Sequence, residues 1–550
     1  MSSLKPAEKW TTPTAHQKEP MDRSQDNIPG VDRTASRDVG KTAPVLAPET
    51  SPDGLGRNAG GDTASSTPVF GPYQNFERML VRYNLESRGI QRVLPAHRHT
   101  TDHLGFIQVC MLWVSINLTA NNITLGMLGP AVFYLSFRDS CLTAVFGMLI
   151  GCLPVAYIAT FGPRSGNRTM VLTRYIMGWW PTKIIVVLTL VILLGYCLID
   201  VVVAGQILSA VSTNNSLSIV VGIIITGILA WIVTTFGYSV FHQYQRYAWL
   251  PQLIANMILS GVAGPRFDLY SDPSSGLDSR TVAGNRLSFF SLCLAAAITY
   301  SETGADFFVY YPENSSKIKM FGVTVIGLAI SFTTMFVIGI GLGSGIASNR
   351  AWSDAYDTSQ GALIVEGLRP LGAFGSFCSV VIALGLISNL VAPTYASGID
   401  WQVLGHHFEK VPRVVWNTFS VVIYTVCAIA GRANLAAIFT NFLALMGYWV
   451  SIWIAIVLEE HIIFRKFLGL GWDWDAWNDR HQLPLGIAAI VAFVVGWVGA
   501  ILCMAQVWYI GPISGLIGEY GGDLGNYVGF AWAAIVYAPL RWFEMKRFGR

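Results

Sequence analysis

Stretches of about 20 mostly apolar residues recur along this 550-residue chain from residue 105 onward, separated by short polar breaks. A helix needs about that length to cross the hydrocarbon core of a bilayer, where the backbone must satisfy its hydrogen bonds internally. Hydrophobic residues make up 53% of the chain and charged residues only 13%, which is unusual for a soluble protein. The pattern therefore predicts an all-α polytopic membrane protein.

We expect twelve transmembrane helices. Their ranges are 105–128, 137–161, 182–211, 217–237, 247–264, 287–311, 319–346, 372–399, 413–430, 433–458, 484–508 and 525–541. Lys and Arg concentrate in the loops after the even-numbered helices and in the C-terminal tail, and such loops face the cytoplasm. Both termini are then expected to be cytoplasmic, which agrees with an even number of helices.

The rest of the chain divides into three shorter regions around the twelve-helix membrane domain at 105–541. Residues 1–75 are rich in small and polar residues, which predicts a disordered cytoplasmic tail. Residues 76–104 are expected to be a basic, membrane-proximal segment, and residues 542–550 a cytoplasmic C-terminal tail.

Two features outside the helices are open to modification. The N-terminal lysines are candidate acceptors for a ubiquitin ligase, although solvated charge is the simpler interpretation; they are Lys5, Lys9, Lys18 and Lys41. Asn214 begins a glycosylation sequon in a loop predicted to face outward, very close to the membrane. Whether Asn214 is glycosylated stays open.

Polar residues interrupt the first and sixth apolar stretches at mid-depth. "WVSINLTANNITLGMLGP" includes Ser115 and Asn121, and "AAAITYSETGADFFVYYP" includes Tyr300 and Glu302. Irregular backbone at this depth must face protein or a water-filled cavity. Breaks five helices apart are typical of two inverted five-helix repeats with a midplane binding site, here followed by two C-terminal helices. Kinked helices packed by small residues are the alternative.

A single carboxylate, Asp200, lies within the third apolar stretch, one helical turn after Tyr196. A charged side chain at mid-membrane costs about 2.5–3.5 kcal/mol on insertion scales, and it usually serves a proton path, an ion or a ligand. A structural ion pair or a neutral, hydrogen-bonded acid is the alternative. In a fold of two inverted five-helix repeats the third helix corresponds to the eighth, and we expect the two to meet; the eighth carries Asn389.

Other motifs favour ordinary explanations. "GIGLGSG" at 339–345 resembles a phosphate loop, but it ends an apolar stretch, which favours close helix packing. "GHHFE" at 405–409 lacks a further ligand at a suitable spacing for a metal. We therefore expect no metal, no cofactor and no enzymatic activity.

Three segments carry a family resemblance. "WVSINLTANNITLGMLGPAVFYLSFRDSC", "GPRSGNRTMVLTRYIMGWWPTK" and "GADFFVYYPENSSKIKMFG" resemble the fungal purine-cytosine permeases of the nucleobase and cation symporter family, in order and spacing, over residues 80–545. The resemblance implies proton-coupled uptake of cytosine, adenine, guanine or hypoxanthine at the plasma membrane by alternating access.

The resemblance also implies roles for particular residues. Tyr196 and Tyr300 stand where aromatic side chains stack on the base, and the family usually has Trp at Tyr300. Asn389 matches the eighth-helix amide that contacts the polar edge of the base in this family. Asp200 stands where the family usually has Asn, and Glu302 stands where it usually has a hydroxyl.

These acids change what the site is expected to bind. An ionised carboxylate only accepts hydrogen bonds, so Asp200 favours a cationic ligand or an edge rich in N–H groups. A vitamin B6-like or other cationic heterocycle is therefore the alternative substrate, and a membrane receptor or enzyme is disfavoured. The expected substrate site comprises Tyr196, Asp200, Tyr300, Asn389, Ser115 and Asn121, and the expected proton-coupling residues are Asp200 and Glu302.

Overall fold

The structure is a computed structural model that describes residues 89–98, 103–212, 216–236 and 238–550. The chain divides into two units, Met1–Thr67 and Pro68–Arg550, and all that follows concerns the second unit. The expected disordered tail, its candidate ubiquitin acceptors and the Asn214 sequon lie outside the described residues. Most of the segment at 76–104 also lies outside the described residues.

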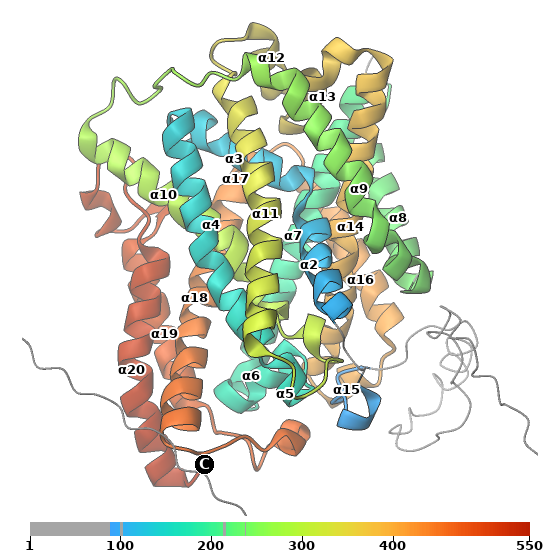
Figure 1. Cartoon of the computed structure of the whole chain (residues 1–550). Coiled ribbons are helices and arrows are strands. Elements are labelled where there is room, and N and C mark those ends of the chain that lie inside the picture. The colour runs from blue at the N-terminus through green and yellow to red at the C-terminus, as the bar shows by residue number, and fades with distance from the viewer. Residues whose placement is uncertain (1–88, 99–102, 213–215, 237) are drawn as a thin grey trace, which may run out of the picture. The chain divides into compact units, whose positions relative to one another are not determined.

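The described residues are almost entirely helical (Figure 1). The long helices are α2 (His103–Asn117), α3 (Ala120–Ala131), α4 (Phe137–Ala159), α7 (Pro181–Val211), α8 (Ile219–Phe236), α9 (Tyr238–Ala263), α10 (Ser279–Ile298), α11 (Lys317–Ser344), α14 (Ala373–Val403), α16 (Arg413–Gly431), α18 (Ala444–Glu459), α19 (Ile487–Cys503) and α20 (Gly525–Phe548).

Short elements connect these helices. They are η2 (Pro95–His97), α5 (Gly162–Ser165), α6 (Thr169–Met177), η4 (Gly264–Arg266), η5 (Thr299–Thr303), η6 (Asp306–Phe308), α12 (Arg350–Thr358), α13 (Gln360–Leu368), η7 (Arg369–Leu371), α15 (His406–Glu409), α17 (Leu435–Ile438), η8 (Phe439–Leu443), η9 (Glu460–Phe467), η10 (Trp474–Asn478) and η11 (Ser514–Leu516). Two-residue strands β1 (Ala505–Gln506) and β2 (Tyr509–Ile510) pair antiparallel, with Ala505 opposite Ile510.

Seven of the described helical segments are long and apolar enough to cross a membrane, and the bent pair α2–α3 would be an eighth. Two further apolar helices, Ile219–Thr235 and Ile487–Cys503, are shorter. The expected stretches at 247–264 and 525–541 form α9 and α20, which are not among these spans. The all-helical membrane class agrees with the sequence, whereas the count of twelve stays a prediction.

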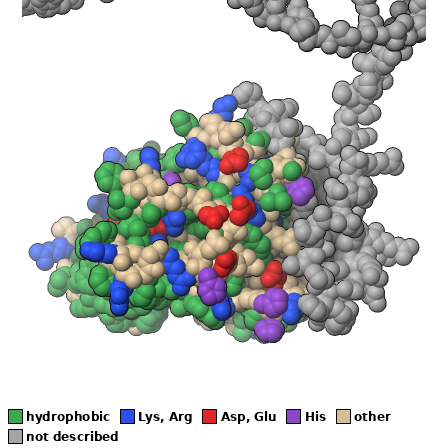
Figure 2. Space-filling view, turned by 90° about the horizontal axis from the view of Figure 1, so that it is seen from below, with side chains coloured by type: hydrophobic (Ala, Val, Ile, Leu, Met, Phe, Trp, Pro, Cys, Tyr) green, Lys and Arg blue, Asp and Glu red, His purple; other side chains and the backbone are tan. Residues whose placement is uncertain are grey.

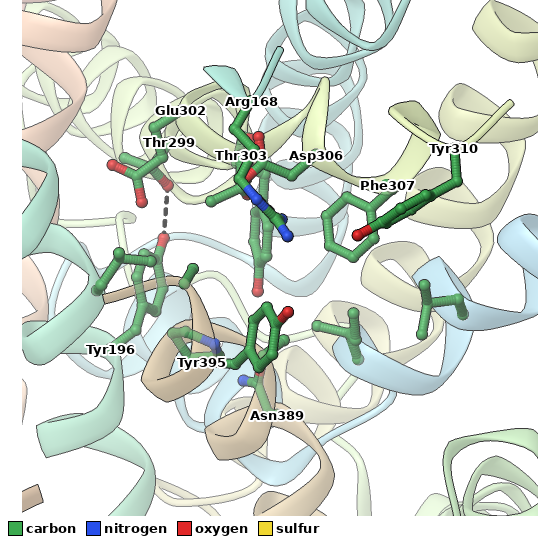
Figure 3. Close-up of a pocket in the computed structure, with 17 residues that line it drawn as sticks. Arg168, Tyr196, Thr299, Glu302, Thr303, Asp306, Phe307, Tyr310, Asn389 and Tyr395 are labelled. Carbon is green, nitrogen blue, oxygen red and sulfur yellow. Dashed lines mark hydrogen bonds and ion pairs between the residues drawn. The ribbon is translucent and has the colours of Figure 1, made fainter. Parts of the chain in front are cut away.

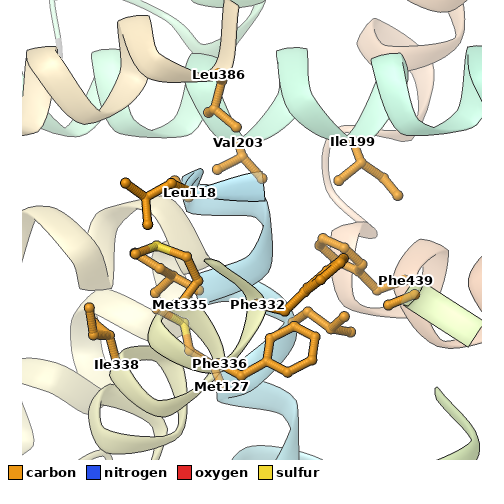
Figure 4. Close-up of a cluster of buried hydrophobic side chains, with 14 of the residues drawn as sticks. Leu118, Met127, Ile199, Val203, Phe332, Met335, Phe336, Ile338, Leu386 and Phe439 are labelled. Carbon is orange, nitrogen blue, oxygen red and sulfur yellow. The ribbon is translucent and has the colours of Figure 1, made fainter. Parts of the chain in front are cut away.

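Helix packing at the centre depends on glycine. A Cβ atom on Gly339 of α11 would lie 2.0 Å from the carbonyl oxygen of Ile123 in α3, and one on Gly343 would lie 2.7 Å from that of Met127. Only glycine lets the two backbones approach so closely. The "GIGLGSG" segment is therefore a helix-packing surface, as predicted. Figure 4 shows the surrounding apolar core, where Phe332 and Phe336 of α11 lie near Met127.

The first apolar stretch is broken at residues 118–119, where α2 and α3 meet at a bend of 57°. Asn122 closes the end of α2 by donating from Nδ2 to the Asn117 carbonyl oxygen at 2.8 Å. Asn121 Oδ1 accepts hydrogen bonds from Thr119 Oγ1 at 2.6 Å and from the Asn122 backbone N–H at 2.9 Å. The polar residues of this stretch thus satisfy backbone and side-chain groups at the break.

The few described residues of the segment at 76–104 contact protein. The backbone N–H of Val93 donates to the Gly166 carbonyl oxygen at 2.8 Å, and Ile90 is buried. Arg92 also donates to the Ser165 carbonyl oxygen at 2.9 Å. Residues 89–98 therefore pack on the turn between α5 and α6, a contact that the expectation of a surface-lying segment did not include.

A buried ion cluster joins η9, α20 and the start of α19. Glu460 accepts from Arg465 at 2.8 Å, from Arg541 at 3.1 Å and from the Tyr537 hydroxyl at 2.9 Å. The Glu460 side chain is fully buried, and Arg541 is only 3% exposed. Arg541 also pairs with Glu544, whose carboxylate accepts the backbone N–H groups of Gly486 and Ala488 at the start of α19.

We expect Glu460→Gln to lower the unfolding free energy by about 3 kcal/mol, because removing one partner leaves buried cations without their counter-charge. Thermal unfolding of the purified protein in detergent measures the change. Glu366→Gln is the matched control, since Glu366 pairs with Arg369, whose side chain is 74% exposed. Equal, small effects of both substitutions would show that the cluster does not stabilise the fold.

Candidate functional site

A cavity of about 220 Å³ lies where four parts of the fold meet (Figure 3). Its walls come from α2, α7, α14 and the irregular segment η5–η6 that follows α10. These are the first, third, eighth and sixth of the expected spans, from which the sequence predicted that polar groups converge. Helix α7 packs along α14, so residues of both helices reach the same cavity.

Tyr196 and Tyr300 form an aromatic pair in the cavity wall, which also contains Phe307, Tyr310 and Tyr395. The rings of Tyr196 and Tyr300 have centroids 5.8 Å apart and planes inclined by 39°. The Tyr196 hydroxyl lies 2.7 Å from Thr299 Oγ1 and 3.2 Å from the Ala296 carbonyl oxygen, both near the end of α10. Since carbon atoms in van der Waals contact lie about 3.5 Å apart, a planar ligand stacked between the two tyrosines requires their rings to separate to roughly 7 Å.

Asn389 and Asp200 lie deeper in the same region. Asn389 lines the cavity and is 2% exposed. Asp200 is fully buried behind the lining residues, and its charge is influenced by the Asn389 amide. Neither carboxylate oxygen of Asp200 has a partner of ordinary hydrogen-bond geometry among the described residues. Such a group is expected to be protonated or to acquire a ligand.

A second group of acids surrounds the side of the cavity near α6. Glu302 lines the cavity and is 3% exposed, and its charge interacts with those of Asp306 and Asp400. Asp306 accepts from the backbone N–H and the hydroxyl of Thr169 at 2.7 and 2.8 Å, and it lies 3.7 Å from Arg168. Three carboxyl groups therefore share the neighbourhood of the Arg168 guanidinium.

This arrangement can bind and release a proton. Closely spaced buried carboxyl groups cannot all ionise beside one guanidinium, because each further negative charge is repelled by the others. Arg168 also lies over the Tyr395 ring at 5.8 Å, and Arg413 lies over the same ring at 4.1 Å. A change in the charge of Glu302, Asp306 or Asp400 would thus act directly on a cation that lines the cavity.

Sequence reasoning missed Asp400 and Arg168. Asp400 follows directly after the expected end of the eighth span, and it belongs to α14, which continues to Val403. Arg168 counted only as a positive charge of an inside loop, although it stands within one of the segments that carry the family resemblance. Predicting a longer eighth helix would have included Asp400. No local feature of the sequence predicts that Arg168 reaches the cavity.

Three expected substrate-binding residues do not line the cavity: Asp200, which lies behind the lining residues, Ser115 and Asn121. α2 presents Leu112 and Ile116 to it, while Ser115 is fully buried elsewhere on the helix. Asn121 is engaged at the break between α2 and α3 by the hydrogen bonds described above. The reason is geometric, because neighbouring residues of a helix point in different directions and the break turns the chain away.

Among the described residues, no group of three or more His, Cys, Asp or Glu side chains could hold a metal ion.

Comparison with known proteins agrees with these features. Residues 97–470 match the family model of permeases for cytosine/purines, uracil, thiamine and allantoin. The chain is 32% identical to the vitamin B6 transporter TPN1 of Saccharomyces cerevisiae over 85% of this chain and 88% of the relative. It is 34% identical to the purine-cytosine permease fcyB of Emericella nidulans, over 87% of this chain and 92% of that relative.

The fold has a solved counterpart in Mhp1, a nucleobase-cation-symport-1 family transporter, in a closed conformation with bromovinylhydantoin bound. The TM-score is 0.59 at 13% sequence identity, covering 84% of this chain and 96% of Mhp1. The names of the relatives describe transporters and permeases rather than enzymes. The chain therefore belongs to the family of permeases for cytosine/purines, uracil, thiamine and allantoin, a family of multi-pass membrane transporters.

Proposed function

We propose that the protein takes up a small, planar nitrogen heterocycle together with protons across the plasma membrane, by alternating access. The proposal includes twelve membrane-spanning helices, ten of them in two inverted repeats, with both termini in the cytoplasm. The observation that carries it is the cavity itself, where an aromatic pair, an amide and several acids converge at the irregular η5–η6 segment. Family membership supports transport as the activity.

The acids favour a vitamin B6-like heterocycle as the substrate. Asp200 has no hydrogen-bond partner of ordinary geometry among the described residues, and it lies close to Asn389 on the cavity wall. An ionised carboxylate is stabilised by a ligand N–H group, most strongly by a protonated ring nitrogen. The resemblance to a vitamin B6 transporter over most of both chains is consistent with this choice.

A nucleobase is the second candidate. The Asn389 amide both donates and accepts hydrogen bonds, which suits the mixed donor and acceptor edge of a purine or cytosine. The tyrosine pair can stack on either kind of ring. The purine-cytosine permease fcyB is similar over most of both chains and supports this alternative.

Uptake by a yeast strain that lacks its own transporters tests the proposal. Radiolabelled B6 vitamers, purines and pyrimidines are offered one at a time to cells expressing the full chain. We expect saturable uptake of at least one B6 vitamer that increases as the external pH falls. Saturable uptake of nucleobases alone would establish the second candidate, and uptake of no heterocycle by cells with surface-localised protein would contradict both.

We expect Asp200→Asn to raise KM for a cationic vitamer by about tenfold, because a charge-assisted hydrogen bond is replaced by a neutral one. The same substitution should favour nucleobases relative to vitamers, since an amide can both donate and accept. Competition uptake assays measure both effects. Asp139→Asn is the control, because Asp139 pairs with Arg286 in an ion pair that the cavity does not include. An unchanged substrate range with reduced surface expression would indicate that Asp200 is structural.

We expect Glu302→Gln to flatten the dependence of uptake on external pH. Gln resembles the protonated carboxyl, so the protonation step that drives wild-type uptake at low pH is removed. The initial uptake rate between pH 5 and pH 8 measures the effect, with Glu366→Gln as a control outside the cavity. The same pH profile in wild type and Glu302→Gln would exclude Glu302 as the coupling group.

A further inference from the structure

A second cavity, also about 220 Å³, lies apart from the first. It is formed where the end of α4, the α5 turn, the loop before α11 and the η9–η10 region come together. This is the end of the bundle at which α5, α6 and the C-terminus lie, and Figure 2 shows Lys, Arg, Asp, Glu and His side chains gathered on that face. Under the proposed function this face is cytoplasmic.

The cavity concentrates positive charge. Arg164 and Lys317 line it, are exposed, and form no ion pair with a carboxylate among the described residues. Together with Lys466 they act on the charge of His461, another lining residue. The carboxylate in the lining belongs to Glu313, and its charge also acts on Arg98. A cluster of neighbouring cations is stabilised by an anion.

The other walls are aromatic and fixed in place. Tyr157 Oη lies 2.5 Å from His461 Nδ1, and the Phe161 ring packs edge-on at 4.7 Å, so the imidazole is held on two sides. Trp472 and Trp474 stack with centroids 4.7 Å apart and planes within 7°. Cations beside a rigid aromatic wall suit a ligand that has both an anionic group and a ring.

We propose that this cavity binds the phosphate monoester of a small ring compound, with Arg164 and Lys317 on the phosphate and Trp472 and Trp474 beside the ring. Arg and Lys are the side chains best suited to phosphate oxygens, Arg because two of its N–H groups can engage them at once. The volume of the cavity suits a ligand with one ring or a small fused ring. A phosphorylated heterocycle and the headgroup of a phosphoinositide both have this chemistry.

The α5–α6 turn connects this cavity to the transport cavity. Arg164 lines the second cavity and Arg168, one turn of chain later, lines the first. Between α5 and η6 the packing is tight, since a Cβ atom on Gly162 would lie 2.4 Å from the Ala305 carbonyl oxygen. A ligand that holds Arg164 therefore also restrains η6, and we expect it to slow uptake. This consequence rests on the proposed function, whereas ligand binding does not.

Isothermal titration of the full-length protein in nanodiscs tests binding. The probes are inorganic phosphate, adenosine 5′-monophosphate, pyridoxal 5′-phosphate and unphosphorylated adenosine, with phosphatidylinositol 4-phosphate offered separately within the nanodisc. We expect at least one monoester to bind and adenosine not to bind at this site. The double variant Arg164→Gln/Lys317→Gln should weaken binding by about tenfold or more, because two charged contacts are lost. Arg547→Gln, an exposed cation on the same end, should bind as the wild type does.

The outcomes separate the two sources of the ligand. Binding of a soluble monoester supports a metabolite ligand, and binding only in nanodiscs that contain phosphatidylinositol 4-phosphate supports a lipid headgroup. No binding of any phosphate compound, or equal binding by wild type and the double variant, would overturn the proposal. Uptake into proteoliposomes loaded with the monoester that binds tests the restraint on η6. A slower rate in the wild type but not in the double variant would support the restraint. An unchanged wild-type rate would overturn it. Because titration needs no transport, failure of the proposed function leaves the binding result interpretable.

Discussion

The need to satisfy every backbone polar group within the hydrocarbon core constrains the whole structure. Continuous helices meet it by themselves, and a broken helix meets it only with polar side chains at the break. At residues 118–119 this is the task of Asn121 and Asn122, which bond to groups at the junction of α2 and α3. α2 faces the cavity with Leu112 and Ile116. The polar groups of the cavity come from α7, α14, the η5–η6 segment and Arg168 of the α5–α6 turn.

A second feature of the cavity region is its charged side chains. Its acids lie in two groups: Asp200 beyond Asn389 on one side, and Glu302, Asp306 and Asp400 around Arg168 on the other. Under the proposed function, Asp200 interacts with a ligand edge, and the acids around Arg168 exchange the coupled proton. The segment η5 contains both Tyr300 of the aromatic pair and Glu302 of the acid group, so the two parts of the cavity share one short element.

The turn between α5 and α6 links several parts of the molecule. The backbone N–H of Thr169 donates a hydrogen bond to Asp306 at the transport cavity. The Gly166 carbonyl oxygen accepts one from the backbone N–H of Val93 in the segment 89–98. Arg164 of the same turn lines the second cavity. These contacts on three sides are the basis for the proposed restraint of η6 by a ligand at Arg164, because packed backbones have little room to adjust independently.

The sequence by itself determined the membrane class, the positions of both helix breaks, the helix-packing role of Gly339–Gly345 and the common helix face of Tyr196 and Asp200. These features are local, since they depend on hydropathy, on helical periodicity and on the burial cost of one carboxylate. Only the tertiary structure decided that Ser115 and Asn121 do not line the cavity, that Arg168 does, and that Asp400 lies close enough to Arg168 for their charges to interact. The direction of a side chain relative to distant helices depends on bend angles and crossing geometry, and these are set by packing between segments far apart in the chain.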